Sequence, residues 1–307
     1  MTTITATTIL RSRNASKPEK VLSTLLLRYP RPIHSEFMTH RQFSRNAASS
    51  RAMPVAKMIQ DVMDNPFIPV HWGKNQKGMQ ADEECDEMVT LPGDEDCPNT
   101  DLIFSREEAW LYDRDKAVKM ARAFSDAGYH KQIVNRLLEP FAHITVVVSS
   151  TEWSNFLALR DHPDAEPHIA MLAREVRKEL DREDNIQYLK PGEWHLPFVD
   201  LGNSEARLGG DGPSHGEVSA SIKMAVACCA STSYKTVDGF DMTLEKAIWL
   251  HDKLVGSSPL HASPAEHIAQ ADEYDGLLDR PGWEHEHEHG NFEGFRQYRK
   301  MLPNECL

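Results

Sequence analysis

The residues best suited to chemistry form a basic, hydroxyl-rich run at positions 39–51, Thr-His-Arg-Gln-Phe-Ser-Arg-Asn-Ala-Ala-Ser-Ser-Arg. Three arginines, three serines, a histidine and an asparagine fall within it, and only Glu36 opposes them nearby. Arginine presents a planar fork of donors that suits phosphate, and serine hydroxyls can complete such a site. The run therefore indicates a phosphate-binding segment, with a solvated basic loop as the alternative. No glycine-rich phosphate loop of the P-loop or dinucleotide-binding kind is present.

A second group lies at positions 260–267, Leu-His-Ala-Ser-Pro-Ala-Glu-His. Ser263 followed by Pro264 is typical of a helix N-cap with proline at the first helical position, and Glu266 would complete a capping box. A helix start alone does not account for His261 and His267. These two imidazoles could hydrogen-bond a ligand or bind a metal ion.

Two further arginines flank the strongest strand prediction, the β-branched run at 143–149. Arg136 begins an Arg-x-x-x-Pro sequence, and Arg160 ends Asn-Phe-Leu-Ala-Leu-Arg, which begins at Asn155. Each arginine either contacts an anionic ligand or pairs with a surface carboxylate, and the sequence alone leaves both readings open.

The elements that would position these residues are mostly helices, with a second apolar strand predicted at 21–29. Ser105 and Glu108 form a capping box that predicts where one helix begins. Helices are expected at about 32–43, 54–64, 106–127, 130–139, 151–160, 165–182, 218–230 and 243–255. This pattern indicates an α+β or α/β fold without the regular alternation of a Rossmann domain.

The remaining segments are polar or rich in glycine and proline. We predict a flexible N-terminus at 1–20, one catalytic domain at 21–270 with insertions at 65–104 and 185–217, and a polar C-terminal tail at 271–307. The tail contains Glu-His-Glu-His-Glu-His at 284–289, which could bind a divalent metal. A flexible solvated segment is the favoured reading, so no metal site is predicted.

Composition narrows the possible functions. The chain has 307 residues, is 40% hydrophobic and carries a formal net charge of -13, which disfavours binding to nucleic acid. The sequence contains no run of the roughly 20 apolar residues that are needed to span a membrane, and no secretory signal is recognised. Five irregularly spaced cysteines indicate a reducing compartment, the cytoplasm, rather than a disulfide framework. Cys228 and Cys229, on a predicted apolar helix, are expected in the core.

Together, the motif blocks resemble the flavin-dependent thymidylate synthases of the ThyX type. That family carries Arg-His-Arg followed by Ser-x-Asn-Glu-x-Ser-x-Arg, and the run at 39–51 has the same spacing. The family's Arg-x-x-x-Pro, Asn-Phe-Leu-x-Leu-Arg and His-x-Ser/Thr-Pro-x-Glu-His blocks match 136–140, 155–160 and 261–267. Its Ala-Arg-Val-Ser-Phe/Tyr segment is echoed weakly at 230–234. The matched blocks cover roughly half of the chain.

The order of the blocks differs from that of the family, in which the serine–tyrosine and histidine blocks precede Arg-His-Arg. We interpret this as a circular permutation, which a fold tolerates when its termini lie close together. Residues 228–267 should then fold against residues 30–51. Three positions depart from the family pattern: Thr39 replaces an arginine, Ala47 replaces a glutamate, and Asp164 stands near the place of a flavin-contacting histidine, for which His162 could substitute.

The resemblance implies an enzyme that binds FAD between the subunits of a homotetramer and uses NADPH as reductant. It implies one-carbon transfer from methylenetetrahydrofolate to C5 of dUMP. It places Ser49, Arg51, Arg136 and Arg160 on the nucleotide. It places seven residues near the flavin: His40, Arg41, Asn155, Ser233, His261, Ser263 and Glu266. The expected catalytic residues are His40, Arg41 and Ser49. A related flavin enzyme acting on another pyrimidine nucleotide and a non-catalytic nucleotide-binding homologue are the alternatives.

Overall fold

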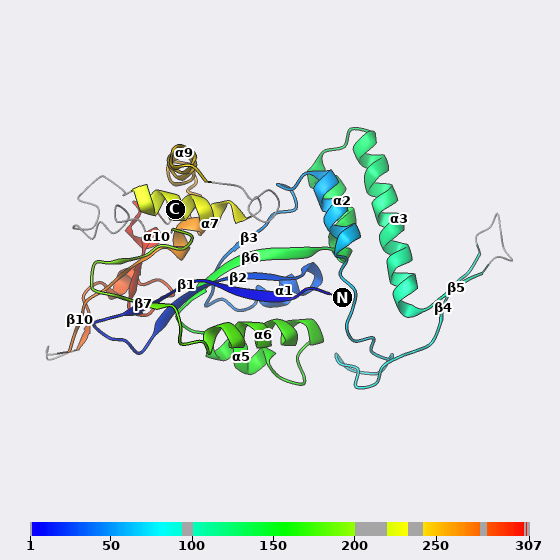
Figure 1. Cartoon of the computed structure of the whole chain (residues 1–307), viewed down its shortest axis with the longest axis horizontal. Coiled ribbons are helices and arrows are strands. Elements are labelled where there is room, and N and C mark those ends of the chain that lie inside the picture. Colours follow the sequence, from blue (N-terminus) through cyan, green and yellow to red (C-terminus); the bar gives the residue numbers. More distant parts are fainter. Residues whose placement is uncertain are drawn as a thin grey trace.

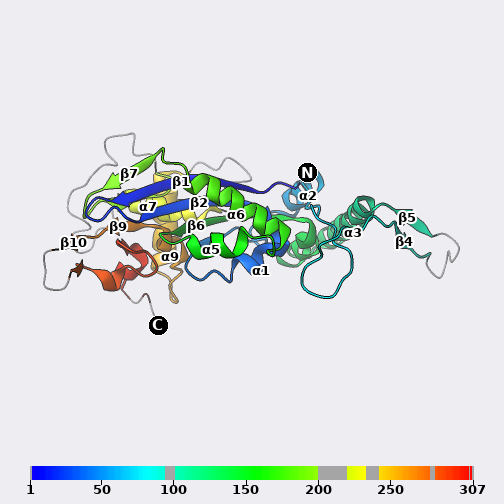
Figure 2. The same ribbon diagram turned by 90° about the horizontal axis from the view of Figure 1, so that it is seen from below.

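A computed structural model of the chain describes residues 2–93, 101–199, 220–232, 242–276, 281–303 and 305. It has a central sheet with helices on both faces and a helical extension at one end, as Figures 1 and 2 show. The predicted α+β class is confirmed. No helix in the described ranges combines the length and apolar character needed to cross a membrane.

The central sheet has five strands in the order β3-β6-β2-β1-β7. All neighbours are antiparallel except β1 and β7, which are parallel. The strands are β1 (Thr5–Asn14), β2 (Val21–Pro30), β3 (Ser44–Ala47), β6 (His143–Ser150) and β7 (Ile186–Leu189). The predictions at 21–29 and 143–149 are confirmed. Both segments are nearly continuous apolar runs because both faces of the sheet are covered.

Side chains alternate between the two faces, so neighbouring residues enter different cores. On one face, Leu25 and Val146 pack against α5 (Ser154–Arg160) and α6 (Pro167–Leu180). On the other, Leu26 and Val147 pack with α7 (Ala220–Ala230) and the 3-10 helix η3 (Ser263–His267). Helix α9 (Leu244–Val255) lies on α7 (Figure 1). Cys228 and Cys229 are buried on α7, as expected.

The helical extension contains α2 (Val55–Asp64), α3 (Arg106–Asp126), α4 (Lys131–Val134) and the 3-10 helix η2 (Asn135–Phe141). The capping box of Ser105 and Glu108 is formed as predicted. The helix expected at 130–139 is the short α4 followed by the 3-10 helix η2, which runs through Pro140 to Phe141. A hairpin of β4 (Val89–Leu91) and β5 (Leu102–Phe104) projects beyond α3 (Figure 1).

The C-terminal residues form small sheets against the other end of the molecule. Strands β8 (Trp194–His195), β9 (Ala269–Ala271) and β12 (Phe295–Gln297) pair in the order β12-β9-β8, and β10 (Tyr274–Asp275) pairs with β11 (Gly282–Trp283). The 3-10 helix η4 (Glu286–Glu288) and α10 (Tyr298–Met301) complete this region.

Three sequence predictions are wrong. The N-terminus is not frayed through residue 20, because β1 is part of the sheet and its polar Ser12 and Asn14 are buried with hydrogen-bond partners. The tail from 271 is not merely a polar appendage, because Phe295 is fully buried. The helix expected at 32–43 is limited to η1 (Arg31–Ile33) and α1 (His34–Phe37), and β3 follows.

Candidate functional site

The three arginines of the 39–51 run have different roles. Arg45 is structural, since its Nη1 donates to the carbonyls of Phe37, Met38 and His40 at 3.0–3.3 Å, where α1 ends. Arg41 and Arg51 are exposed and have no ion pair with any described residue. The two guanidinium groups that remain available for a ligand therefore lie before and after β3.

His40 is buried before β3, with its ring edge-on to Phe156 at 5.0 Å between ring centroids. Arg160 Nε donates to His40 Nε2 at 3.0 Å. Burial, with smaller contributions from the Arg160 and Arg45 charges, lowers the pKa of His40 to about 4. The imidazole is therefore neutral at physiological pH, with its proton on Nδ1.

Arg160 lies with His40 rather than with the other residues assigned to the nucleotide. Its guanidinium pairs with Glu36 at 3.2 Å and donates to Thr39 Oγ1 at 3.4 Å. Thr39, His40 and Arg160 line a small depression of about 160 Å³, here called the His40 pocket. Asn155 and Arg41 also line it. His162 and Asp164 lie on an exposed turn after α5 and do not line it.

A larger depression of about 430 Å³ lies beside Glu266 and is here called the Glu266 pocket. It shares Arg41 and Phe43 with the His40 pocket. Its other lining residues come from the C-terminal region and η3: Glu266, Gly290, Asn291, Gln297, Arg299, Lys300 and Glu305. Glu266 forms an ion pair with Arg299, and Lys300 pairs with Glu305 at 2.7 Å. The pocket is thus a mixed-charge surface in which Arg41 is the cation without a protein counter-charge in the described ranges.

The 261–267 block does not form the predicted capping box. The N-cap position is occupied by Ala262, no side chain caps the segment, and Glu266 is engaged by Arg299 instead. Ser263 is exposed at the first position of a 3-10 helix, whose residues Ala265 and His267 are buried. His261 is exposed and does not line the Glu266 pocket. Ser233, also assigned to the flavin, lies outside the described residues.

Segments about two hundred residues apart meet at β3, as the permutation hypothesis required. Asn46 Nδ2 donates to the carbonyl of Cys229 on α7 at 2.5 Å. Gln297 Nε2 donates both to Ser44 Oγ at 3.2 Å and to the carbonyl of Glu266 at 3.0 Å. The predicted packing of 228–232 and 261–267 against 30–51 is therefore confirmed, although the contact does not by itself establish a permutation.

The remaining nucleotide-assigned residues lie at the far end of β3. Ser49 Oγ accepts from the backbone N–H of Arg51 at 3.3 Å. The next serine, Ser50, donates to Glu139 at 2.7 Å, and Arg136 pairs with the same carboxylate at 3.3 Å. A four-residue strand is about 13 Å long. Ser49, Arg51 and Arg136 thus form a group separate from His40, Arg41, Asn155 and Arg160.

Several residues of this region were missed from the sequence. Asn291 donates to the carbonyl of Gln42 at 2.8 Å, and Gln297 bonds Ser44, yet both lie in the presumed tail. Arg299 and Lys300 supply charge to the Glu266 pocket. The one available signal was the apolar pattern around Phe292, Phe295 and Tyr298, which indicates packing rather than a tail.

Comparison with known proteins gives distant structural likenesses. The UMP/dUMP methylase PolB from Streptomyces cacaoi, bound with 5-Br UMP, is similar at 15% identity and a TM-score of 0.43, covering 61% of this chain and 91% of that one. Thymidylate synthase X from Helicobacter pylori with FAD and dUMP is similar at 15% identity and a TM-score of 0.33, covering 52% and 67%. A second such complex is similar at 17% identity and a TM-score of 0.33, covering 54% and 74%.

No protein-family model matches the sequence, and no curated protein matches it.

Proposed function

We propose that this protein is a flavin-dependent thymidylate synthase, which methylates dUMP to dTMP with methylenetetrahydrofolate as the one-carbon donor and NADPH as the reductant. The observation that carries the proposal is the convergence of distant motif blocks on β3. Arg160 bonds His40, Asn46 bonds Cys229, and Gln297 joins Ser44 to Glu266. A chance resemblance between scattered short motifs would not require them to meet.

The end of β3 that carries Ser49, Arg51 and Arg136 is suited to the nucleotide. Arg51 has an exposed guanidinium without a counter-charge in the described ranges, which is what a phosphate group needs. Arg136 is 58% exposed and shares Glu139 with Arg31, so part of its hydrogen-bonding capacity remains available. We propose that these two arginines bind the phosphate of the nucleotide and that Ser49 contacts it nearby.

The opposite end of β3 fits part of a flavin dinucleotide. The Glu266 pocket, at about 430 Å³, is within the usual range for ligand sites. Arg41 offers a positive charge for a pyrophosphate, and the exposed amide of Asn155 can fix a polar ring. Neutral His40 can donate a hydrogen bond through Nδ1 without adding charge. When bound, the flavin would supply the redox chemistry, while these residues would bind and orient it.

Since β3 separates the two groups, we propose that a second copy of the chain completes each site. A homotetramer with FAD at its subunit interfaces would satisfy this requirement. Light scattering of the flavin-loaded protein tests it, because a chain that holds FAD as a monomer would contradict the proposal. We also propose a reducing, cytoplasmic location, because the five cysteines of the chain are irregularly spaced.

We also propose that the chain is a circularly permuted relative of the ThyX enzymes. A permuted chain, opened near residue 215 and with its present ends joined by a long flexible linker, should fold and bind flavin. A short linker between close termini, which the permutation hypothesis favoured, is ruled out, because β1 begins at the end of the sheet remote from α10 (Figures 1 and 2). Failure of the permuted chain to bind flavin, alongside a parent that does bind it, would count against the permutation.

The nucleotide role is tested by Arg51→Ala, with Arg122→Ala as the control. Arg122 is an exposed arginine on α3, away from β3. A lost charge-assisted contact of roughly 1.5–3 kcal/mol weakens dUMP binding by about one to two decades. Titration of dUMP into the flavin-loaded proteins should show this loss in the first variant only. Unchanged affinity would remove Arg51 from the site, and a parent that binds no flavin would refute the enzyme proposal.

A related enzyme acting on another pyrimidine nucleotide is the second candidate. It is favoured by Ala47, which packs against the core shared by β2, β6 and α6 and offers no carboxylate where the family has glutamate. It is also favoured by Thr39, whose hydroxyl donates to the carbonyl of Glu36 at 2.7 Å. Competition between dUMP, UMP and dCMP in the binding assay would decide between the two candidates.

A further inference from the structure

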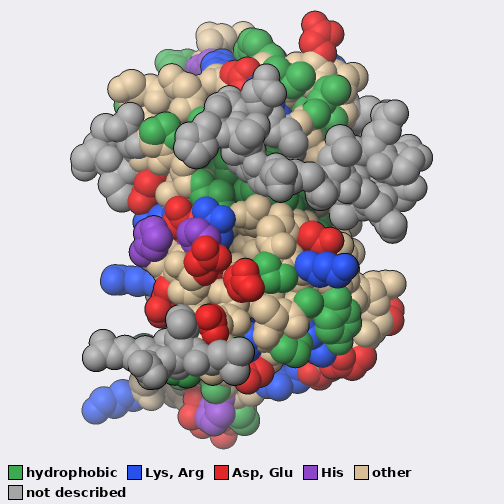
Figure 3. Space-filling model, turned by 90° about the vertical axis from the view of Figure 1, so that its left-hand side faces the viewer, with side chains coloured by type: hydrophobic (Ala, Val, Ile, Leu, Met, Phe, Trp, Pro, Cys, Tyr) green, Lys and Arg blue, Asp and Glu red, His purple; other side chains and the backbone are tan. Residues whose placement is uncertain are grey.

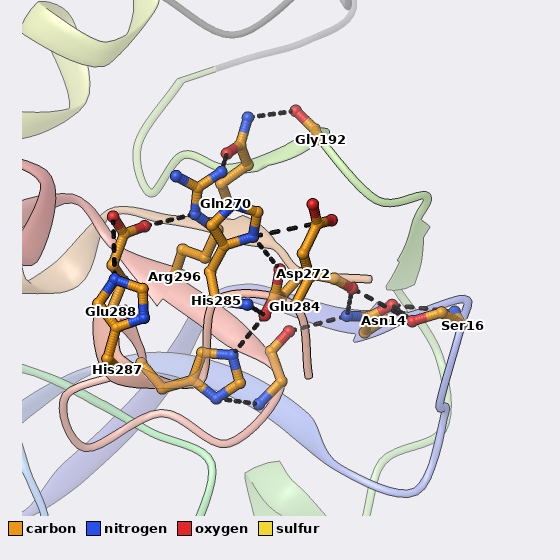
Figure 4. A network of polar contacts seen from close by, with 12 residues as sticks. Asn14, Ser16, Gly192, Gln270, Asp272, Glu284, His285, His287, Glu288 and Arg296 are labelled. Carbon is orange, nitrogen blue, oxygen red and sulfur yellow. Dashed lines mark hydrogen bonds and ion pairs between the residues drawn. The ribbon is translucent and has the colours of Figure 1, made fainter. Parts of the chain in front are cut away.

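A compact group of metal-ligating side chains lies outside the proposed catalytic region, at the base of the β10–β11 hairpin (Figure 4). Asp272 directly follows β9, and Glu284 and His285 directly follow β11. One ligand atom from each residue lies within 4.8 Å of the others. His285 Nδ1 is 2.9 Å from Asp272 Oδ1 and 3.9 Å from Glu284 Oε2. Bonds of roughly 2.1 Å from one ion place adjacent donors about 3–3.5 Å apart, so small side-chain movements would complete a coordination sphere.

The carboxylate of Asp272 is fixed from one side. Its Oδ2 accepts from the backbone N–H of His285 at 2.8 Å and from His289 Nε2 at 2.9 Å. Gly294 N–H donates to His289 Nδ1 at 3.2 Å, so His289 Nε2 carries the proton and acts as a donor. His289 therefore supports Asp272 and is not a ligand, which leaves Oδ1 facing His285 and Glu284. Supporting hydrogen bonds of this kind orient the ligands of protein metal sites.

The buried position of Asp272 sets it apart from an ordinary surface acid. Its side chain is only 1% exposed. Hydrogen bonds from His289 and from the backbone N–H of His285 hold it in place. A buried carboxylate held in this way is the kind of ligand that favours a divalent cation.

The surroundings are acidic. Glu273, Asp275, Glu286 and Glu288 neighbour the three ligands along the chain. The nearby Arg296 is paired with Glu288 at 2.6 Å and also donates to Gln270 Oε1 at 3.0 Å. Lys17 lies over the Tyr274 ring, 4.4 Å from its centroid. Figure 3, which views this end of the molecule, shows histidine and acidic side chains gathered on this face, with basic side chains beside them.

We propose that Asp272, Glu284 and His285 bind a divalent transition-metal ion, of which Zn²⁺ is the reference. One imidazole nitrogen and two carboxylates form a ligand set that suits Zn²⁺ or a similar first-row ion better than Ca²⁺ or Mg²⁺. The ion takes the place of the hydrogen between His285 Nδ1 and Asp272 Oδ1, and the imidazole then carries its proton on Nε2. Water molecules fill the remaining positions.

The site joins residues that are distant along the chain. It links the end of β9 to the segment after β11, which continues through His289 to Asn291. Asn291 donates to the carbonyl of Gln42 and lines the Glu266 pocket. Metal binding would therefore stabilise the C-terminal wall of that pocket. The inference does not depend on the proposed enzyme activity, because the ligands lie outside the residues assigned to flavin and nucleotide.

The experiment titrates Zn²⁺ into the metal-stripped full-length protein and follows the heat of binding by calorimetry. We expect one Zn²⁺ per chain. His285→Ala and Glu284→Gln should each weaken Zn²⁺ binding by about tenfold or more. Loss of a residue that merely supports a metal ligand costs about 10–100-fold in affinity, and loss of a ligand itself should cost at least as much. His287→Ala is the matched control, because His287 belongs to the same tract, is 79% exposed and lies outside the cluster.

Three outcomes of the titration would overturn the proposal. The first is equal losses in the His287 and His285 variants, since that is the behaviour of a histidine-rich tract chelating metal without a defined site. The second is an unchanged affinity in the His285 variant, and the third is the absence of stoichiometric binding by the parent. Circular dichroism excludes misfolding, and X-ray absorption of the zinc-loaded parent supplies an independent test. That spectrum should show one imidazole in an oxygen-rich shell, and several imidazoles would refute the assignment.

Discussion

Acidification should destabilise this fold through proton uptake by two histidines that are fully buried. A row of polar side chains crosses the covered face of the sheet. Ser12 Oγ contacts His195 Nδ1 at 2.6 Å, and His195 Nε2 contacts Thr24 Oγ1 at 2.8 Å. Thr24 contacts Ser149 at 2.6 Å, and Ser149 Oγ contacts His267 Nδ1 at 2.9 Å. Both imidazoles are inaccessible to solvent, so protonating either would place an uncompensated charge in the core.

The size of the effect follows from the difference between folded and unfolded pKa values. Burial lowers the pKa of His195 and of His267 to about 3 in the folded state, against about 6.5 in the unfolded chain. The unfolded chain therefore binds more protons between these values, and stability falls as pH decreases through this window. At about pH 5.5, one unit below the unfolded pKa, each histidine costs about 1.4 kcal/mol. The pair then costs about 3 kcal/mol, a large part of a typical stability of about 5–15 kcal/mol.

Three further histidines also destabilise the fold on acidification, and two carboxyl groups do so only at lower pH. His34, His40 and His143 also have pKa values lowered to about 4, chiefly by burial, and add to the loss. The carboxyls of Glu152 and Asp272 have pKa values of about 2, held down by hydrogen bonds. Their contribution to the free energy of unfolding is present above the unfolded pKa of about 4 and is lost as the pH falls toward the folded pKa. A comparison of about pH 8 with about pH 5.5 therefore isolates the histidines.

The assay is urea unfolding at these two pH values and one protein concentration, for the parent, His267→Asn and His287→Asn. Asparagine at 267 retains an acceptor for Ser149 but cannot titrate. Between about pH 8 and about pH 5.5, the free energy of unfolding of this variant should fall by about 1.4 kcal/mol less than that of the parent, whatever the variant's absolute stability. The exposed His287 should not alter the pH dependence. If His267→Asn shows the same pH dependence as the parent, His267 titrates normally in the folded protein and the reasoning fails.

Three further predictions concern stability at neutral pH, measured by urea unfolding. Ser105→Ala removes the N-cap of α3 and should cost about 1 kcal/mol; no loss would mean that the capping box contributes nothing. Phe156→Ala opens a cavity in the aromatic core where Phe156 is 1% exposed and should cost about 3–5 kcal/mol, so a loss below about 1 kcal/mol would contradict that packing. Arg45→Met removes donors to three carbonyls and should cost about 1.5–3 kcal/mol, whereas Arg122→Met should be neutral, and equal effects would argue against a structural Arg45.

The sequence by itself determined the elements whose local signals agree with their environment. The strands at 21–29 and 143–149 are long apolar runs, and such segments remain strands wherever both faces are covered. The start of α3 was predictable because a capping box satisfies backbone N–H groups through neighbours in the chain, without help from the rest of the fold. The sequence also singled out the 39–51 run, although not the separate roles of its three arginines.

The tertiary structure alone decided which polar residues are buried and which face a ligand. Strand β1 is polar in sequence, but the side chains of Ser12 and Asn14 are satisfied by residues more than 180 positions away. Arg45 and Arg41 are equivalent in sequence, yet among the described residues Arg45 alone of the two donates to backbone carbonyls. Likewise, Asn291 and Gln297 join the site only because β12 pairs with β9. A buried polar group is stable only when a partner is supplied, and partners distant in sequence are brought together by the fold.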